Sequence, residues 1–290
     1  MITPNRALIA FVLTVAMVPL FAAQFTVTLV NYIGLSALVA LGLVLLTGIG
    51  GLTSFGQAAF VGLGAYTTAY LTTRHGMSPW GTLIVGMAVT TAVSLALGFI
   101  TLRLSGHFLP LGTIAWGISL YFLFGNMEAL GGHGGIDSIP PVDLFGLELG
   151  SSRAFFYVIW VTLLAAIVTT RNMLDSREGR AMRSLRSMTM TEAMGINTLR
   201  YRMVLFMIAA QFACVSGWLY AHLQRFVNPT PFSLGHGIEY LFMAVLGGAG
   251  AVWGAVFGAG AVTFLKEWLQ DLLPKLLGAS GNFEMVVFGL

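Results

Sequence analysis

Few side chains in this sequence lie at spacings that could support enzyme chemistry. No two of the five histidines are four residues apart, the spacing of a metal-binding pair on one helix face. The one cysteine, Cys214, can form neither an internal disulfide nor a cysteine-based metal site. The motifs H-E-x-x-H, G-x-S-x-G and G-x-x-x-x-G-K-[ST] are absent. We therefore expect a chain that is not an enzyme and that carries no cofactor and no metal ion.

One stretch does place charged side chains at a helical spacing. Arginines recur every third residue from Arg180 to Arg186, so on a helix they would form one basic stripe. A short helix is expected directly afterwards. There Thr191 suits an N-cap, Glu192 suits the positive end of the helix dipole, and Gly195 suits a C-cap.

The elements that must position these residues follow from the composition. The 290 residues are 57% hydrophobic and only 9% charged, whereas a soluble domain carries about 25% charged residues. With a mean hydropathy of +0.86, the chain has too few polar side chains to cover a surface in water. These values exclude soluble globular, disordered and collagen-like proteins. They predict a membrane protein with a single domain over residues 1–290.

Uncharged intervals mark the expected membrane spans. Residues 7–73 hold no charged side chain, which is enough chain for three helices of about 20 residues. No interval shows the period-two alternation of a membrane barrel strand. We interpret segment 7–23 as a retained helix rather than a cleaved signal peptide. The predicted spans are 7–23, 26–48, 51–72, 75–102, 104–127, 154–170, 203–224 and 240–265, with a further one beginning near Phe283. The fold class is thus an all-α polytopic membrane protein of about 8–10 spans.

Two loops of opposite charge set the orientation. Segment 171–202 holds half of the basic residues of the chain: Arg171, Arg177, Arg180, Arg183, Arg186, Arg200 and Arg202. Segment 126–152 has four acidic residues and neither lysine nor arginine. Basic loops stay in the cytoplasm, so we place 171–202 inside and 126–152 outside. Counting spans back puts the N-terminus inside as well, although Arg74 then falls outside.

The basic loop is longer than orientation alone requires. A short exposed helix can be held in the groove of a soluble partner. We favour this docking role for the loop. The alternative is a basic loop that contacts only lipid headgroups.

The spans hold few of the ionisable groups that ion-coupled transport uses. Glu239 is the best candidate, and we expect it at the membrane boundary because it precedes an apolar run. A transporter with such spans would need its energy from a separate ATPase.

Glycines recur at one spacing in two distant segments. Each series has steps of six residues: Gly50, Gly56 and Gly62, then Gly248, Gly254 and Gly260. Each middle glycine follows an aromatic residue, Phe55 or Trp253. The pattern favours an internal duplication, and glycine-interrupted helices at matching places point to a translocation path. The alternative is close helix packing through small residues.

Several blocks resemble the high-affinity branched-chain amino acid ABC importer permeases of the LivM type. They follow the order of that family from about residue 45 to 268. The blocks are residues 45–66, 111–113, 131–141, 192–196, 217–221 and 246–250. Where that family has a terminal hydrophobic span, this sequence stops at Leu290, so we expect the C-terminal span to be incomplete.

The resemblance implies a helical ABC importer transmembrane domain, type II-like, in the bacterial inner membrane. The implied partners are two cytoplasmic ABC ATPase subunits, a second related permease subunit and an external substrate-binding protein, besides membrane lipid; no nucleic acid is expected. ATPase coupling would involve Glu192, Ala193, Met194, Gly195 and Ile196, with Arg183 and Arg186 beside them. The translocation path would include Thr53, Ser54, Phe55, Gly56, Gln57, Gly248, Gly250 and Trp253.

The expected substrate is a branched-chain or other small neutral amino acid, carried by alternating access. An uncharged path suits a net-neutral solute because a fixed charge is costly to bury in a membrane. Urea, short amides or sugars, which relatives in the same superfamily carry, remain alternatives. A different class, a stand-alone channel or secondary carrier, also remains open.

Overall fold

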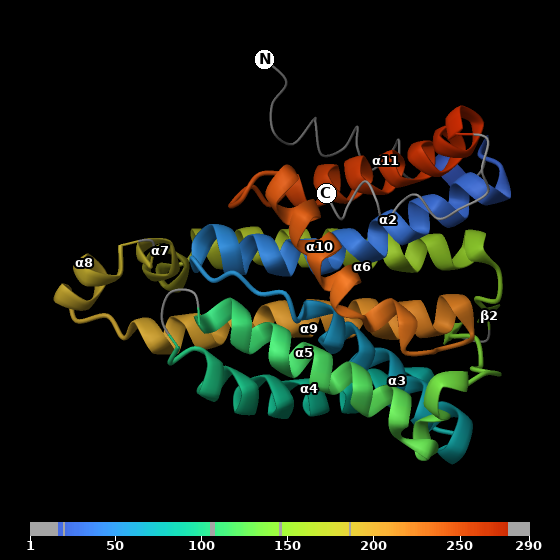
Figure 1. Ribbon diagram of the computed structural model, residues 1–290, viewed down its shortest axis with the longest axis horizontal. Coiled ribbons are helices and arrows are strands. Elements are labelled where there is room, and N and C mark those ends of the chain that lie inside the picture. The colour runs from blue at the N-terminus through green and yellow to red at the C-terminus, as the bar shows by residue number, and fades with distance from the viewer. Residues whose placement is uncertain (1–16, 20, 105–107, 145–146, 186, 278–290) are drawn as a thin grey trace.

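The computed structural model describes residues 17–19, 21–104, 108–144, 147–185 and 187–277, which are mostly helical (Figure 1). The α-helices are α2 (Gln24–Leu43), α3 (Gln57–His75), α4 (Pro79–Thr101), α5 (Phe108–Asn126), α6 (Ser152–Asp175), α7 (Arg177–Ser184), α8 (Met188–Ala193), α9 (Thr198–Gln224), α10 (Leu234–Leu246) and α11 (Gly254–Leu277). A π-helical segment, η1 (Val44–Ile49), continues α2. The 3-10 turns are η2 (Glu128–Leu130), η3 (Gly132–Gly134) and η4 (Thr230–Phe232), and β1 (Asp143–Leu144) pairs antiparallel with β2 (Leu147–Glu148).

Five helical segments of the described chain are long and apolar enough to cross a membrane. They are α2 with η1, α4, α5, α6 and α9. They correspond to the predicted spans 26–48, 75–102, 104–127, 154–170 and 203–224. The prediction of an all-α polytopic membrane protein is confirmed. Most of the predicted span 7–23, and the one beginning near Phe283, lie outside the described residues.

Two predicted spans differ from the structure. The helix predicted over 51–72 begins later, because residues 50–56 form a non-helical connection and α3 covers Gln57–His75. Segment 240–265 is two helices, α10 and α11, separated by residues 247–253. Gly248 and Gly250 there both have φ +99, which a residue with a Cβ rarely adopts. A hydropathy pattern cannot detect these breaks, since glycine is compatible with an apolar span.

Helix α9 lies at the centre of the bundle, where it packs against α2, α3 and α4 (Figure 1). Its crossing with α3 depends on glycines of both helices. A Cβ on Gly217 would collide with the carbonyl group of Val61, and a Cβ on Gly64 would collide with that of Cys214. Small residues allow two backbones to approach closely, which is how helices associate in a lipid environment. Close helix packing through small residues therefore occurs at this crossing, at glycines outside the two spaced series.

The two loops of opposite charge lie at opposite ends of the bundle. Helices α7 and α8 project from one end, and the β1–β2 hairpin lies at the other (Figure 1). Helix α6 connects the two ends, as the prediction of one span between them requires.

Candidate functional site

Both glycine series mark a place where a helix ends and another begins. The non-helical segments 50–56 and 247–253 are each seven residues long, and each is followed directly by a helix. The end of η1, directly before the first segment, also approaches the second segment. A Cβ on Gly48 would collide with the backbone of Gly250. The two glycine series therefore mark breaks of the same length, and the contact between the two regions is made by Gly48 and Gly250, which lie outside both series.

The first segment, residues 50–56, contacts both α5 and α10. The backbone N–H of Phe55 donates to Oγ1 of Thr113 at 3.2 Å. Gly56 faces the ring of Trp116, and a Cβ on Gly237 would collide with the carbonyl oxygen of Phe55. The first segment thus connects α5 on one side with the start of α10 on the other.

Two polar side chains, one in this segment and one at the start of α3, are buried without hydrogen bonds to the described residues. Ser54 and Gln57 are each 1% exposed, and their side-chain polar atoms have no hydrogen-bond partner among the described residues. An unpaired buried polar group costs about 1–3 kcal/mol. Such a group in a native protein calls for an explanation, which can be a functional role, an ordered water or local strain. Thr53 is half-buried, as is Trp253 in the second segment, and Gly250 is exposed.

The structure therefore brings together only part of the predicted path. Gly250 reaches Gly48 at the end of η1, whereas Phe55 and Gly56 pack toward α5 and α10. The assignment of these residues to a translocation path stays a prediction.

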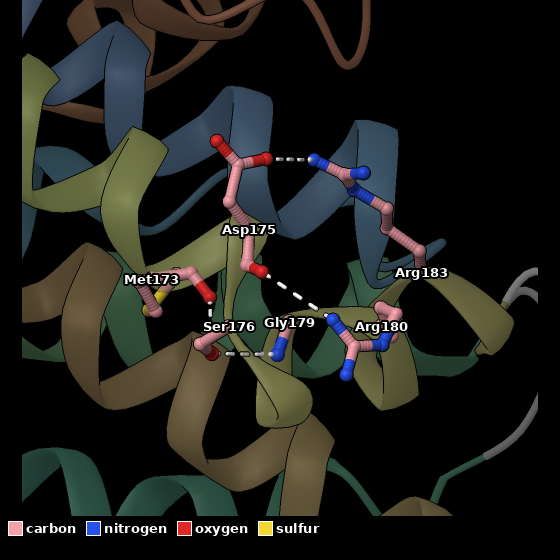
Figure 2. Close-up of polar contacts among 6 residues, drawn as sticks. All are labelled: Met173, Asp175, Ser176, Gly179, Arg180 and Arg183. Atoms are coloured by element: carbon pink, nitrogen blue, oxygen red, sulfur yellow. Dashed lines mark hydrogen bonds and ion pairs between the residues drawn. The ribbon is translucent and has the colours of Figure 1, made fainter.

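At the other candidate site, α7 is fixed tightly to the end of α6 (Figure 2). Oγ of Ser176 accepts from the backbone N–H of Gly179 at 3.1 Å and donates to the carbonyl of Met173 at 2.6 Å. The Arg183 guanidinium lies 3.3 Å from the Asp175 carboxylate. Arg180 reaches the Asp175 carbonyl oxygen at 3.5 Å. Two arginines of the expected basic stripe thus contact the end of α6, and Arg186 lies outside the described residues.

The short helix of the loop begins earlier than predicted. Helix α8 starts at Met188, so Thr191 is inside the helix and is not its N-cap. Thr191 is buried, and its hydroxyl lies 2.6 Å from the Ser184 carbonyl and 2.8 Å from the Ser187 carbonyl. A threonine hydroxyl can bond a carbonyl one turn earlier as readily as it caps a helix start. The C-cap prediction is correct, because Gly195 has φ +77 and its N–H donates to the Glu192 carbonyl.

The end of α8 forms the tip of the loop. Glu192, Ala193, Met194 and Gly195 are all exposed, and Ile196 is half-buried. The Met194 side chain is 69% exposed, which is unusual for a large apolar residue. Oε1 of Glu192 accepts from the Thr198 hydroxyl at 2.8 Å and so connects the tip to the start of α9. Four of the predicted coupling residues, Glu192 to Gly195, are thus exposed together next to the start of α9, and the coupling role of the whole predicted set stays a prediction.

Sequence reasoning missed an ion pair between α10 and α11. Glu239 lies on the short helix α10, where it pairs with Lys266, and its expected place at the membrane boundary stays a prediction. The two side chains are only 17% and 24% exposed. The pair borders a cavity of about 280 Å³. Glu239 and Lys266 flank the predicted span 240–265, one at each end, and only the break between α10 and α11 brings them together.

Residues 25–290 match the protein family described as the permease component of the branched-chain amino acid transport system. The chain belongs to this family.

Two curated relatives are the high-affinity branched-chain amino acid transport system permease proteins LivM of Salmonella typhimurium and of Escherichia coli. Each is 30% identical to the chain over 232 residues, which is 71% of the chain and 55% of the relative. The permease protein LivH of Escherichia coli is 36% identical over 116 residues, which is 39% of the chain and 37% of the relative. The chain thus spans about half the length of the LivM proteins that it matches. No solved structure matches the chain.

These comparisons confirm the resemblance to branched-chain amino acid permeases. Together with five apolar helices, they make the chain a multi-pass membrane protein of a transport family. The relatives are named as permease proteins of a transport system, which agrees with a chain that is itself no catalyst. The chain is similar to two kinds of permease protein, LivM and LivH.

Proposed function

We propose that the chain is a permease subunit of an ATP-binding cassette importer that moves branched-chain or other small neutral amino acids into the cell. The family match over residues 25–290 carries the proposal. Translocation would proceed by alternating access at the glycine-rich breaks. Broken helices that meet inside a bundle are a recurring basis for such movements.

The energy source in this proposal is a pair of separate ATPase subunits in the cytoplasm. The exposed tip formed by Glu192, Ala193, Met194 and Gly195 is the surface on which we place their contact. The tip is suited to transmit force, because Thr191 and Glu192 bond it to α7 and α9. A second permease subunit would complete the pathway, and an external binding protein would deliver the amino acid at the end that carries the β1–β2 hairpin.

The direct test is transport by reconstituted protein. The chain is placed in proteoliposomes with the second permease, the ATPases and the binding protein that the proposal requires, and uptake of radiolabelled leucine is measured. We expect uptake only with enclosed or added ATP on the ATPase side and only with the binding protein on the other side.

The same assay separates the alternatives. Leucine uptake by the chain alone, without ATPases, would establish a channel or secondary carrier and refute the proposal. ATP-driven uptake of urea, an amide or a sugar in place of leucine would keep the importer and change its substrate.

A further inference from the structure

An apolar groove separates two of the long apolar helices, α6 and α9. Helix α9 packs closely against α2, α3 and α4 and makes far fewer contacts with α6. The space between α6 and α9 has a volume of about 400 Å³. We call it the α6–α9 groove, and its apolar lining is formed by Met173, Val204, Met207, Ile208 and Phe212. Both helices are long and apolar enough to cross a membrane, so a lipid acyl chain is a suitable occupant.

The lining residues of α9 form a stripe that continues toward the start of the helix. Residues three or four apart share one face of a helix. Arg200 and Tyr201 precede Val204 by four and three residues, so they extend the stripe beyond the groove. Arg200 is exposed. The apolar groove therefore leads, along one face of α9, to a charged side chain.

The start of α7 is held beside the same stripe. The Tyr201 hydroxyl donates to Oε2 of Glu178 at 2.6 Å. Arg177, the residue before Glu178, is the first residue of α7 and is exposed. Arg177 and Arg200 thus lie at the same end of the groove, on the side of the bundle from which α7 projects (Figure 1). We call this the basic end of the groove.

Positive charge predominates at the basic end. The acids nearest to it in the sequence, Asp175 and Glu178, each interact with a donor of the protein. Asp175 pairs with Arg183 at 3.3 Å (Figure 2), and Glu178 accepts from the Tyr201 hydroxyl. Segment 171–202 as a whole has seven arginines and three acidic residues. An anionic group at the basic end is therefore attracted by an excess of positive charge.

We propose that the α6–α9 groove binds an anionic phospholipid, with an acyl chain against the apolar lining and the phosphate at Arg177 and Arg200. Basic pockets between membrane helices are suited to anionic headgroups. In a membrane the acyl chain gains packing contacts rather than release from water, so the headgroup decides which lipid is retained. The inference goes beyond the proposed function, because it depends on neither the solute nor the energy source.

The charge of the headgroup separates this occupant from others. A zwitterionic phospholipid has the same phosphate but carries a cation beside it, which the arginines repel. A segment of protein lying in the groove would exclude lipid altogether. Selective binding of an anionic lipid at the groove is therefore the outcome that distinguishes the proposal.

The test uses a fluorescent reporter at the edge of the groove. Thr169 lines the groove and is exposed, so Thr169→Cys can carry a bimane label, while Cys214 is fully buried and labels little. The full chain, with the proteins that copurify with it, is placed in nanodiscs. These contain a minor fraction of phosphatidylglycerol or phosphatidylcholine with a nitroxide on the acyl chain, which quenches nearby bimane. Met173→Cys is the second reporter if Thr169→Cys does not assemble.

We expect the nitroxide phosphatidylglycerol to quench the reporter about threefold more strongly, or more, than the phosphatidylcholine at equal content. Val161→Cys is the matched control position. Val161 is on the same helix, is 65% exposed and does not line the groove. Bimane at this position should be quenched equally by the two lipids, because ordinary contact with the membrane does not select a headgroup.

Adding Arg177→Gln/Arg200→Gln to the reporter should abolish the preference for phosphatidylglycerol while the protein still assembles. Arg74→Gln/Arg171→Gln is the control that removes the same charge. Arg74 is near the end of α3. Arg171 is two residues from both Thr169 and Met173, so it lies on the opposite side of α6 from them. This control should keep the preference.

Three results would overturn the site. The first is equal quenching of Thr169→Cys by the two lipids, or the same preference at Val161→Cys. The second is no quenching of Thr169→Cys by either lipid, which would show that protein covers the groove. The third is a preference that survives in Arg177→Gln/Arg200→Gln, since the headgroup would then be held by other residues.

Discussion

At the scale of single residues, two glycines share one backbone conformation and differ in where they lie. Gly195 (φ +77) ends α8 at the tip of the basic loop, and Gly76 (φ +60) ends α3. Neither has a heavy atom within 4 Å of the place where a Cβ would stand. A non-glycine residue at either position would cost about 1–2 kcal/mol in backbone strain, so the two costs are comparable. Any difference between them therefore reports on what the surrounding surface contacts.

We expect Gly195→Trp to abolish ATP-driven leucine uptake and to leave membrane insertion intact. The added indole would protrude from the tip, where we place the ATPase contact. Gly76→Trp is the matched control and should retain uptake, because it imposes the same strain at a different helix end. Uptake assays in proteoliposomes and membrane fractionation give the two readouts. Normal uptake in Gly195→Trp would place the docking surface elsewhere.

A glycine at the α3–α9 crossing gives a second prediction. Gly217→Ala should lower the free energy of unfolding by about 1–3 kcal/mol or more, because the new methyl group would collide with the Val61 carbonyl. Gly134→Ala is the control, since nothing lies within 4 Å of its Cβ position. Thermal unfolding in detergent measures both. Equal midpoints for the two variants would contradict the close crossing.

At the scale of elements, the loop between α5 and α6 is held against the ends of the bundle helices. Ile136 and Val227 exchange two backbone hydrogen bonds. Nδ1 of His222 lies 2.9 Å from the Pro140 carbonyl, and the Trp80 indole N–H donates to the Asp143 carbonyl at 3.0 Å. A loop fixed at several points presents a defined surface to a partner at this end of the molecule.

We expect Trp80→Phe to loosen this loop locally. The change removes one hydrogen bond worth about 0.5–1.5 kcal/mol and keeps an aromatic ring on Trp218. Hydrogen exchange of the amides near Asp143 should then accelerate by roughly two- to tenfold. Trp268→Phe, on an exposed position of α11, should leave these rates unchanged. Unaltered exchange rates in Trp80→Phe would show that the other contacts of the loop hold it in place without the Trp80 hydrogen bond.

At the scale of the whole molecule, the asymmetry between the ends defines an orientation. The exposed basic loop with α7 and α8 is at one end, and the acidic loop with the β1–β2 hairpin is at the other (Figure 1). The excess of arginine predicts that the first end faces the cytoplasm.

Thiol labelling tests that orientation. Met194→Cys at the tip and Asp137→Cys in the acidic loop introduce exposed thiols at opposite ends. A membrane-impermeant maleimide should label Met194→Cys only in inside-out vesicles and Asp137→Cys only in right-side-out vesicles. The native chain, whose single cysteine is buried, is the unlabelled control. The reverse pattern would invert the topology.

Composition and hydropathy alone determined that this is a helical membrane protein, and they located most of its long spans. They could do so because burial in lipid requires apolar side chains along the whole helix. Hydropathy did not give the extent of the breaks at residues 50–56 and 247–253, since glycines are compatible with an apolar helix. Capping preference misplaced Thr191, because its hydroxyl bonds the carbonyls of Ser184 and Ser187, which precede α8.

The sequence showed the spacing of the glycines and the loop residues Glu192–Gly195. The structure located the glycines at two helix breaks and these loop residues at an exposed tip. Only the tertiary structure decided that Gly48 meets Gly250 and that Glu239 pairs with Lys266. Both contacts join residues far apart along the chain, and their formation depends on how α2, α10 and α11 pack. The sequence indicated membrane spans with almost no charge, and the packing brings two of the few charges together beside a cavity.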